Sequence, residues 1–209
     1  MTANVDTTTA PISDAGMVVM DREGRIRIPR GGAVVAAILR IGIGLIYLWG
    51  FVSQGFGVHY TNQVVDNNAP AAQQVQYHWS FDVDTDDGWI TSGFAKSPTE
   101  GYVDNNSHGP LAFIPQNLPV GLDDFGWMFA LGGLGIALTF GICSRIAGWG
   151  GFLLNIMIWF STFPPSTNPI FDAEHFMFAF IILLLMWIQA SNHWGIGRWW
   201  RAKTPAFLH

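Results

Sequence analysis

Residues 34–56 read VVAAILRIGIGLIYLWGFVSQGF, an apolar run interrupted by one charged side chain, Arg40. An apolar helix needs about 20 residues to cross the hydrocarbon core of a bilayer. The run therefore predicts a transmembrane helix. It is too long for the apolar core of a cleaved signal peptide, and no small-residue cleavage site follows it closely.

Three more stretches predict membrane helices, at residues 125–142, 146–163 and 171–190. The last is apolar only from residue 176 to 188, and it reaches spanning length if its first turn includes Asp172 and His175. Acidic side chains are favoured at a helix N-terminus, so this start is reasonable. The expected fold is an all-α membrane protein, a bundle of four transmembrane helices.

Basic residues predict the orientation, because cytoplasmic segments of membrane proteins are enriched in Lys and Arg. Eight of the ten basic residues lie before the first span, between the second and third, or after the fourth. The segment 57–124 instead holds nine acidic residues and one basic residue, Lys96. We expect both ends in the cytoplasm and this segment as a long extracytoplasmic loop between the first two helices. The location would be the cytoplasmic membrane of a prokaryote.

The expected organisation has three parts. Residues 1–32 form a cytoplasmic segment, in which residues 17–20 and 25–28 predict a short hairpin. Residues 33–190 form the membrane domain with its long outer loop, and residues 191–209 form a cytoplasmic tail.

Small residues at four-residue spacing predict close helix packing in lipid. In the second predicted helix they are Gly133, Ala137 and Gly141, and in the third they are Ala147 and Gly151.

Composition excludes several classes of protein. Half of the residues are hydrophobic and 12% are charged, about half the charge of an average soluble domain. The net charge of -5 makes nucleic acid an unsuitable partner, because binding phosphates needs clustered Lys and Arg. The single Cys excludes a disulfide framework, a multi-Cys zinc site, and a Cys-ligated iron–sulfur cluster or covalently attached haem held by this chain alone.

Arg40 is the first candidate for chemistry, because an ionisable group inside a span is costly and often functional. It lies about seven residues from the cytoplasmic edge, roughly 10 Å at 1.5 Å per residue. Two roles stay open. In the first, Arg40 has a structural role, and its long side chain either extends to the lipid headgroups or pairs with a group inside the protein. The other is a ligand for a bound cofactor.

Asp172 and His175 are the second candidates. They are three residues apart, so they share a face if the fourth helix begins there. A carboxylate beside an imidazole suits proton exchange near neutral pH, which a quinone head group at the membrane surface needs. The alternative is a pair of ordinary first-turn residues that start the helix.

Asp82, Asp84 and Asp86 are the third candidates, because acids at alternate positions resemble the start of a calcium loop. The EF-hand pattern fails, since its sixth position is Asp87 instead of Gly and its twelfth is Gly93 instead of Glu. An irregular Ca²⁺ site and a solvated acidic turn remain as alternatives.

Four stretches, in the same order along the chain, resemble segments of the DoxX/DoxD family of small four-helix membrane proteins. LRIGIG at 39–44 is similar to its first-helix Leu-Arg-x-x-x-Gly pattern, and GWITSGF at 88–94 to the Gly-Trp-Thr-x-x-Gly-Phe segment of the DoxD-like outer loop. GIALTFGICSR at 135–145 resembles the Gly-x-x-Leu…Gly-x-x-x-Arg hairpin. DAEH at 172–175 with the later Trp194-Gly195 resembles the fourth-helix Asp-x-His region and its Trp-Gly tail.

The resemblance implies a role beside respiratory quinone chemistry. DoxD-like members are linked to thiosulfate:quinone oxidoreductase, and DoxX-like members to other membrane oxidoreductase and redox-stress complexes. This chain departs from the pattern in two places. The Lys often found after the first-helix Gly is absent from GFVSQ at 50–54, and residues 58–87 look like an insertion.

Charge limits the thiosulfate role, because an anionic substrate would meet a strongly acidic outer segment. The leading expectation is a DoxX-like membrane subunit of a quinone-linked oxidoreductase complex, which works with other membrane-protein subunits. In it, Asp172 and His175 would line the quinone site, and Arg40 would be a buried structural or ligand-binding charge. The alternative is a non-catalytic accessory subunit that binds its partners through the outer loop and the N-terminal segment.

Overall fold

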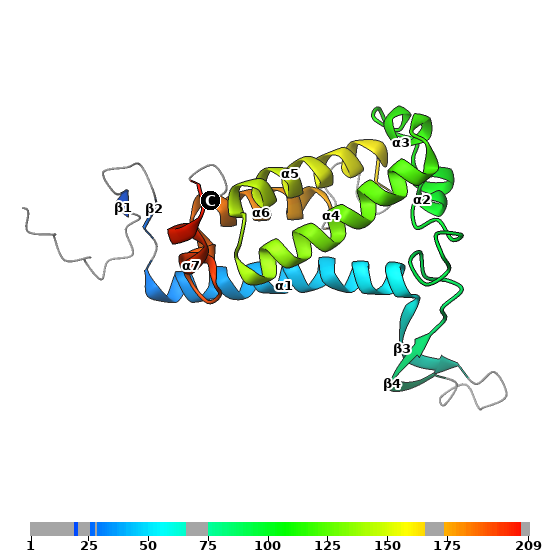
Figure 1. Cartoon of the computed structure of the whole chain (residues 1–209), viewed down its shortest axis with the longest axis horizontal. Coiled ribbons are helices and arrows are strands. Elements are labelled where there is room, and N and C mark those ends of the chain that lie inside the picture. Colours follow the sequence, from blue (N-terminus) through cyan, green and yellow to red (C-terminus); the bar gives the residue numbers. More distant parts are fainter. Residues whose placement is uncertain (1–18, 21–25, 28, 66–74, 166–173, 206–209) are drawn as a thin grey trace, which may run out of the picture.

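The computed structural model of the chain describes residues 19–20, 26–27, 29–65, 75–165 and 174–205. It is mostly helical, and its four longest helices lie side by side (Figure 1). These are α1 (Arg30–Phe56), α4 (Val120–Phe140), α5 (Ser144–Ser161) and α6 (Phe176–Trp187). Helix α1 packs against α4, α5 packs against α6, and α4 lies beside α5. We call the end of the bundle at which α1 ends the hairpin end, and the opposite end the tail end.

The helices begin and end close to the predicted spans, with differences at their polar ends. Helix α1 begins at Arg30 and α4 begins at Val120, both earlier than predicted. The first turn of α4 includes Asp123, and an acidic side chain is favoured at a helix N-terminus. Helix α6 is shorter than the predicted span. The predicted start of that span at residues 171–173 lies outside the described residues.

Small residues let α1 and α4 approach closely as antiparallel neighbours. A Cβ added to Gly44 would lie 2.6 Å from the backbone nitrogen of Thr139, and one added to Gly135 would lie 2.7 Å from Cγ of Leu48. These positions therefore require the absence of a side chain. The prediction for Gly133 was wrong, since a Cβ there would meet nothing within 4 Å.

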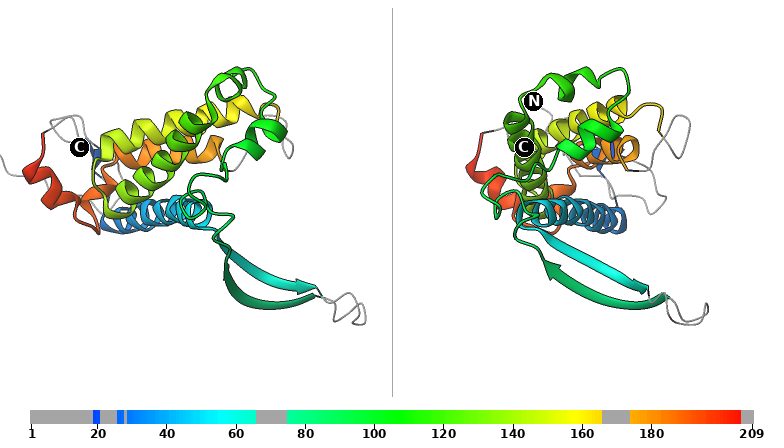
Figure 2. Two further views of the ribbon diagram at one scale, coloured as in Figure 1. Left: turned by 45° about the vertical axis from the view of Figure 1, so that its right-hand side comes forward. Right: turned by 90° about the vertical axis from the view of Figure 1, so that its right-hand side faces the viewer.

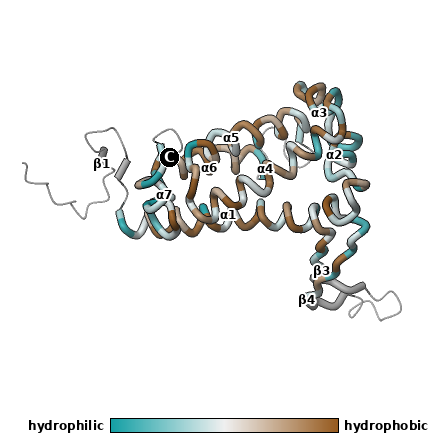
Figure 3. Tube along the Cα trace, in the orientation of Figure 1, coloured by the Kyte–Doolittle hydropathy of each residue, from teal (hydrophilic) through white to brown (hydrophobic). Residues whose placement is uncertain are grey.

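Apolar side chains cover the flanks of the bundle, and its mainly apolar interior also holds a few polar side chains. Large hydrophobic residues are exposed along the flanks of all four helices, among them Val35, Ile38, Leu45, Ile46, Phe129, Ile136, Leu153, Phe180 and Leu184. The interior holds Arg40, Asn155 and Ser161, which are all buried. Figure 3 shows hydrophobic residues along the helices and hydrophilic ones gathered toward the two ends. Among the described residues, α1 is the one helix that is long and apolar enough by itself to cross a membrane, and α6 is apolar but shorter.

The segment between α1 and α4, expected as a long loop, contains secondary structure of its own. It begins with an antiparallel hairpin of β3 (Val58–Val65) and β4 (Val75–Val83), which extends away from the bundle (Figure 2). Two short helices follow, α2 (Glu100–Asn106) and α3 (Phe113–Asn117). The backbone amides of His108 and Gly109 donate to the carbonyl of Ser161, which fastens this segment to the end of α5.

The tail end carries the remaining elements. Strands β1 (Val19–Met20) and β2 (Ile26–Arg27) pair antiparallel where a hairpin is predicted. After α6, the chain forms a short 3-10 helix, η2 (Ala190–Asn192), and then α7 (Gly197–Lys203).

Candidate functional site

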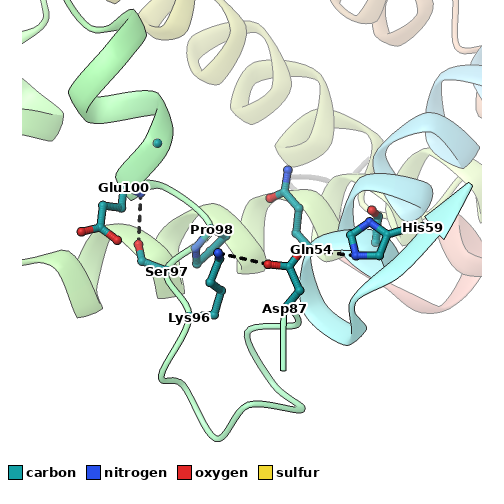
Figure 4. A pocket seen from close by; sticks show the side chains of 9 residues that line it. Gln54, His59, Asp87, Lys96, Ser97, Pro98 and Glu100 are labelled. Carbon is teal, nitrogen blue, oxygen red and sulfur yellow. Dashed lines mark hydrogen bonds and ion pairs between the residues drawn. The ribbon is translucent and has the colours of Figure 1, made fainter. Parts of the chain in front are cut away.

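An open pocket lies at the hairpin end, between the last turn of α1, the first residue pairs of the hairpin and the start of α2 (Figure 4). We call it the outer pocket. Its volume is about 490 Å³, which is within the range of about 300–1,000 Å³ for small-molecule sites. Its lining residues are Ser53, Gln54, His59, Asp87, Lys96, Ser97, Pro98, Glu100 and Gly101.

The end of α1 determines where the pocket walls lie. Gly57 ends the helix in a left-handed conformation, with φ of 66°, and turns the chain into β3. The chain that returns from β4 then supplies donors to the last carbonyls of α1. The amides of Trp89 and Ile90 donate to the carbonyls of Gln54 and Gly55, each at 2.8 Å. These bonds hold the segment that carries Asp87 against the end of α1.

Asp87 joins two basic side chains at the pocket. One carboxylate oxygen lies 3.2 Å from Nε2 of His59, and the other lies 3.1 Å from Nζ of Lys96. Figure 4 shows the three side chains converging, His59 from β3 and the other two from the segment between β4 and α2. The Asp87 side chain is 39% exposed, so these ion pairs contribute little to stability, about 0–1 kcal/mol each. The grouping therefore contributes little to the stability of the fold.

A buried carboxylate fastens the opposite wall of the pocket to α4. One oxygen of Asp124 accepts hydrogen bonds from the hydroxyls of Ser97 and Thr99, both at 2.7 Å. The amide of Thr99 donates to the same oxygen at 3.3 Å. From the same helix, Nε1 of Trp127 donates to Oε1 of Gln54 at 2.6 Å. These contacts hold the pocket walls between α1 and α4.

Two titratable groups behind the pocket have shifted pKa values. Asp123 lies in the first turn of α4, before the predicted apolar span. Burial raises the pKa of Asp123, and the neighbouring charge of Asp124 raises it further, while a hydrogen bond from Thr99 opposes the change. Burial also raises the pKa of Tyr102, whose hydroxyl donates to the carbonyl of Ile158 at 3.4 Å. In both groups, burial makes the ionised form less favourable than it is in water.

Arg40 is buried at the tail end and does not extend to the surface. Its Nη1 donates to the carbonyls of Leu138 and Thr139 at the end of α4, the latter at 3.2 Å. Its Nη2 donates to the carbonyls of His193 and Trp194, the former at 3.4 Å. The carbonyls at a helix C-terminus carry partial negative charge, which suits a cation. Arg40 thus holds the segment after α6 against the end of α4, and its assignment as a cofactor ligand stays a prediction.

The other predicted cofactor residue, His175, lies at the opposite end of the bundle. It precedes α6 directly, and its carbonyl accepts from the amide of Ala179. The next residue, Phe176, has its ring 5.1 Å from that of Trp159 near the end of α5. The structure therefore does not bring Arg40 and His175 together. Asp172, the predicted partner of His175, lies outside the described residues.

Of the predicted calcium ligands, Asp82 lies in β4, and Asp84 and Asp86 follow directly after this strand. Asp82 pairs across the hairpin with His59, and its carboxylate accepts from the amide of Val83 at 2.9 Å. The carboxylate of Asp84 accepts from the amide of Asp86 at 3.0 Å. In the described ranges, no three His, Cys, Asp or Glu side chains are grouped so that they could hold a metal ion. Calcium binding by Asp82, Asp84 and Asp86 stays a prediction.

Sequence reasoning missed the grouping of His59, Asp87 and Lys96. The signal that could have found it is the alternation of polar and apolar residues along 75–83, VQYHWSFDV, which is typical of a strand. Had this strand been paired with residues 58–65, the hairpin would have placed His59 beside the residues that follow β4.

Comparison of the chain with protein-family models, with curated proteins and with solved structures finds no match. The function is therefore inferred from the chain's own residues.

Proposed function

We propose that this chain is a DoxX-like integral membrane subunit of a quinone-linked oxidoreductase complex, and that α1, α4, α5 and α6 all cross the bilayer. The support for membrane insertion is the distribution of side chains. Hydrophobic residues such as Ile46, Phe129 and Leu153 are more than half exposed on the flanks, whereas Arg40 and Asn155 are buried inside. In water this arrangement would be unfavourable, and in lipid it is the expected one.

Charge supports the orientation in which the tail end faces the cytoplasm. Arg30, Arg145, Arg198 and Lys203 belong to this end, and a cytoplasmic excess of basic residues is usual. The hairpin end, with its acidic residues, would face the extracytoplasmic side of a prokaryotic cytoplasmic membrane.

The outer pocket fits a quinone head group better than an anion. It lies at the polar end of an apolar bundle, where the head group of a membrane quinone would lie. Its charged lining residues are Asp87, Glu100 and Lys96, with His59 beside them, so acids outnumber permanent cations. Such a field disfavours a dianion and tolerates a neutral ring.

When bound, a quinone would supply two-electron chemistry that no side chain of this protein can supply. The chain's own residues would bind it and manage protons. Lys96 and His59 can donate hydrogen bonds to carbonyl oxygens of the ring. Asp87 orients the imidazole of His59, which can then exchange a proton with the extracytoplasmic water.

The observation that carries this proposal is the joining of His59 and Lys96 by Asp87 in a pocket of ligand size. The test is the binding of a short-chain ubiquinone analogue to the purified chain in lipid nanodiscs, measured by quenching of tryptophan fluorescence. Trp127 bonds to the pocket residue Gln54 and is therefore a suitable reporter. We expect His59→Ala to weaken binding about tenfold, the effect of losing ~1.4 kcal/mol.

The matched control is His108→Ala, because His108 is an exposed histidine of the same segment but does not line the outer pocket. It should bind the analogue as the parent does. Equal affinity in parent and His59→Ala, or no saturable quenching in the parent, would contradict the proposal.

A second candidate function is that of an accessory subunit without a quinone site. This function is favoured because the buried polar residues form hydrogen bonds within the chain itself. Arg40 bonds to carbonyls, Asn155 to Tyr47, and Asp124 to Ser97 and Thr99. The accessory function is supported if the associated complex dissociates on native gels when the chain is removed, while His59→Ala changes neither assembly nor turnover. The same result would contradict the quinone site.

A further inference from the structure

The hairpin of β3 and β4 has two chemically different faces. Tyr60 and Phe81 are direct cross-strand partners, so they share a face, and their ring centroids lie 5.4 Å apart. Trp79 and Val83 lie on the same face, because side chains alternate along a strand. Trp79 is 81% exposed and Phe81 is 63% exposed. We call Tyr60, Trp79, Phe81 and Val83 the aromatic face.

The opposite face is polar. His59 pairs with Asp82, and Thr61 pairs with Ser80, on either side of the Tyr60–Phe81 pair. The part of the hairpin next to the bundle therefore has one apolar face and one polar face. A soluble protein rarely leaves such a cluster of large aromatic residues uncovered.

Trp49 of α1 shows in which direction the aromatic face is turned. Its ring lies 6.5 Å from that of Tyr60 and 6.1 Å from that of Phe81. Trp49 precedes the end of α1 at Phe56 by seven residues, which is roughly 10 Å along the helix axis. The aromatic face must therefore be turned back toward the middle of the bundle, and the polar face away from it. Figures 1 and 2 show the hairpin leaving the end of α1 sideways, across the direction of the helices.

We propose that the β3–β4 hairpin lies on the outer surface of the membrane, with its aromatic face in the lipid headgroup region. This inference rests on the proposed membrane position of the bundle. Trp49 is itself exposed on α1 beside Leu45 and Ile46, so the aromatic face continues the lipid-facing flank of that helix. Trp and Tyr are the residues that favour the membrane–water interface, since their rings are apolar and their polar atoms stay hydrated. The polar face, with His59, would then meet the extracytoplasmic water.

The observations favour lipid over a protein partner as the occupant. A protein surface could cover the aromatic face from any direction, whereas a bilayer requires that it be turned toward the lipid-facing flank of α1. The contacts of Trp49 with Tyr60 and Phe81 meet that stricter requirement.

The experiment compares nitroxide spin labels on neighbouring residues of the two faces, in full-length protein reconstituted into phosphatidylcholine–phosphatidylglycerol vesicles. Phe81→Cys and Ser80→Cys are labelled in a Cys143→Ser background, since Cys143 is the one native cysteine. Collisions with oxygen report lipid, and collisions with a water-soluble nickel chelate report solvent. We expect the oxygen-to-nickel ratio to be higher at position 81 than at 80, a reversal between adjacent residues.

Three further labels make a negative result interpretable. Val83→Cys and Asp82→Cys repeat the comparison with every aromatic ring intact, in case the hairpin needs Phe81 to fold. Leu153→Cys, on the exposed flank of α5, reports the membrane position of the bundle itself.

If Leu153 reports lipid while positions 81 and 83 report water, the hairpin inference is wrong and the membrane proposal stands. If Leu153 also reports water, the membrane proposal falls and the hairpin inference falls with it. If positions 81 and 83 are shielded from both reagents, protein covers the aromatic face, and the lipid assignment is overturned.

Discussion

The side-chain amide of Asn155 in α5 donates a hydrogen bond of 2.6 Å to the hydroxyl of Tyr47 in α1. The same amide group donates to the carbonyl of Gly151 at 2.7 Å. Both side chains are buried. Because α1 packs mainly on α4, and α5 mainly on α6, this bond joins α1 directly to α5, a pair of helices that is not otherwise closely packed.

Tyr47→Phe should therefore loosen the link between α1 and α5. It leaves one N–H of Asn155 without its acceptor, and the expected loss is about 1 kcal/mol, the usual size for a hydrogen bond between membrane helices. Thermal unfolding in mild detergent measures it. The double variant with Asn155→Leu should recover part of the loss, because no polar group is then left unpaired. If Tyr47→Phe unfolds like the parent, the bond has no structural role.

Arg40→Lys should release the segment that follows α6. A lysine ammonium is a compact point charge. It cannot bond at the same time to the carbonyls at the end of α4 and to the carbonyls of residues 193 and 194. We expect a loss of about 2–3 kcal/mol, because hydrogen bonds to a charged group are lost.

Hydrogen exchange locates the effect of Arg40→Lys. The amide of Ile196, which donates to the carbonyl of Phe140 at 3.1 Å, should exchange faster. Arg30→Lys is the control, since it makes the same change at an exposed position of the same helix. Unchanged exchange around Ile196 in Arg40→Lys would contradict the role of Arg40 as a clamp.

Gly44→Ala should force α1 and α4 apart. The added Cβ would lie 2.6 Å from a backbone nitrogen of α4, which cannot move without shifting the helix. Overpacking of this kind lowers stability by about 1–3 kcal/mol. Gly42→Ala, two residues earlier, meets nothing within 4 Å and should be neutral or slightly stabilising. Equal unfolding temperatures for the two variants would show that the helices do not meet at Gly44.

Asp123→Asn should stabilise the protein at neutral pH. Burial raises the pKa of Asp123, with Asp124 adding to the shift, so the folded chain keeps this proton to a higher pH than the unfolded chain. Stability therefore falls as pH rises from the unfolded to the folded pKa of this group, and the penalty is constant above that interval.

The asparagine variant removes this penalty. Its advantage in unfolding temperature should be present at neutral pH and should vanish as pH falls toward the ordinary carboxyl value of 3.8. Asp104→Asn, at an exposed position, is the control. An advantage that does not change with pH would mean that the substituted amide acts through packing or hydrogen bonding instead of charge.

Sequence periodicity and length predicted the helical part of the fold because each long helix has an apolar run of its own. The run at 34–56 lies within α1, and the short turn at Cys143 between α4 and α5 is where the sequence predicts it. Helix ends were less predictable, since acids such as Asp123 and Asp124 can either start a helix or precede it. The positions where α1 and α4 touch were also missed, because Gly133 and Gly135 look alike in the sequence.

The candidate site was less predictable than the helices. Asp87 lies 28 residues after His59 in sequence, and only the pairing of β3 with β4 brings them together. The sequence places Arg40 as a charge inside an apolar span, but its partners are backbone carbonyls, which have no sequence signature. Contacts of this kind depend on how the chain packs and cannot be found from residue types alone.

The clamp formed by Arg40 bears on how the protein is made. A chain emerges from the ribosome N-terminus first. The guanidinium of the first long helix is therefore translated before its acceptors in α4, and long before residues 193 and 194. In the proposed membrane arrangement, the clamp therefore closes only when the segment after α6 docks, once α6 has inserted.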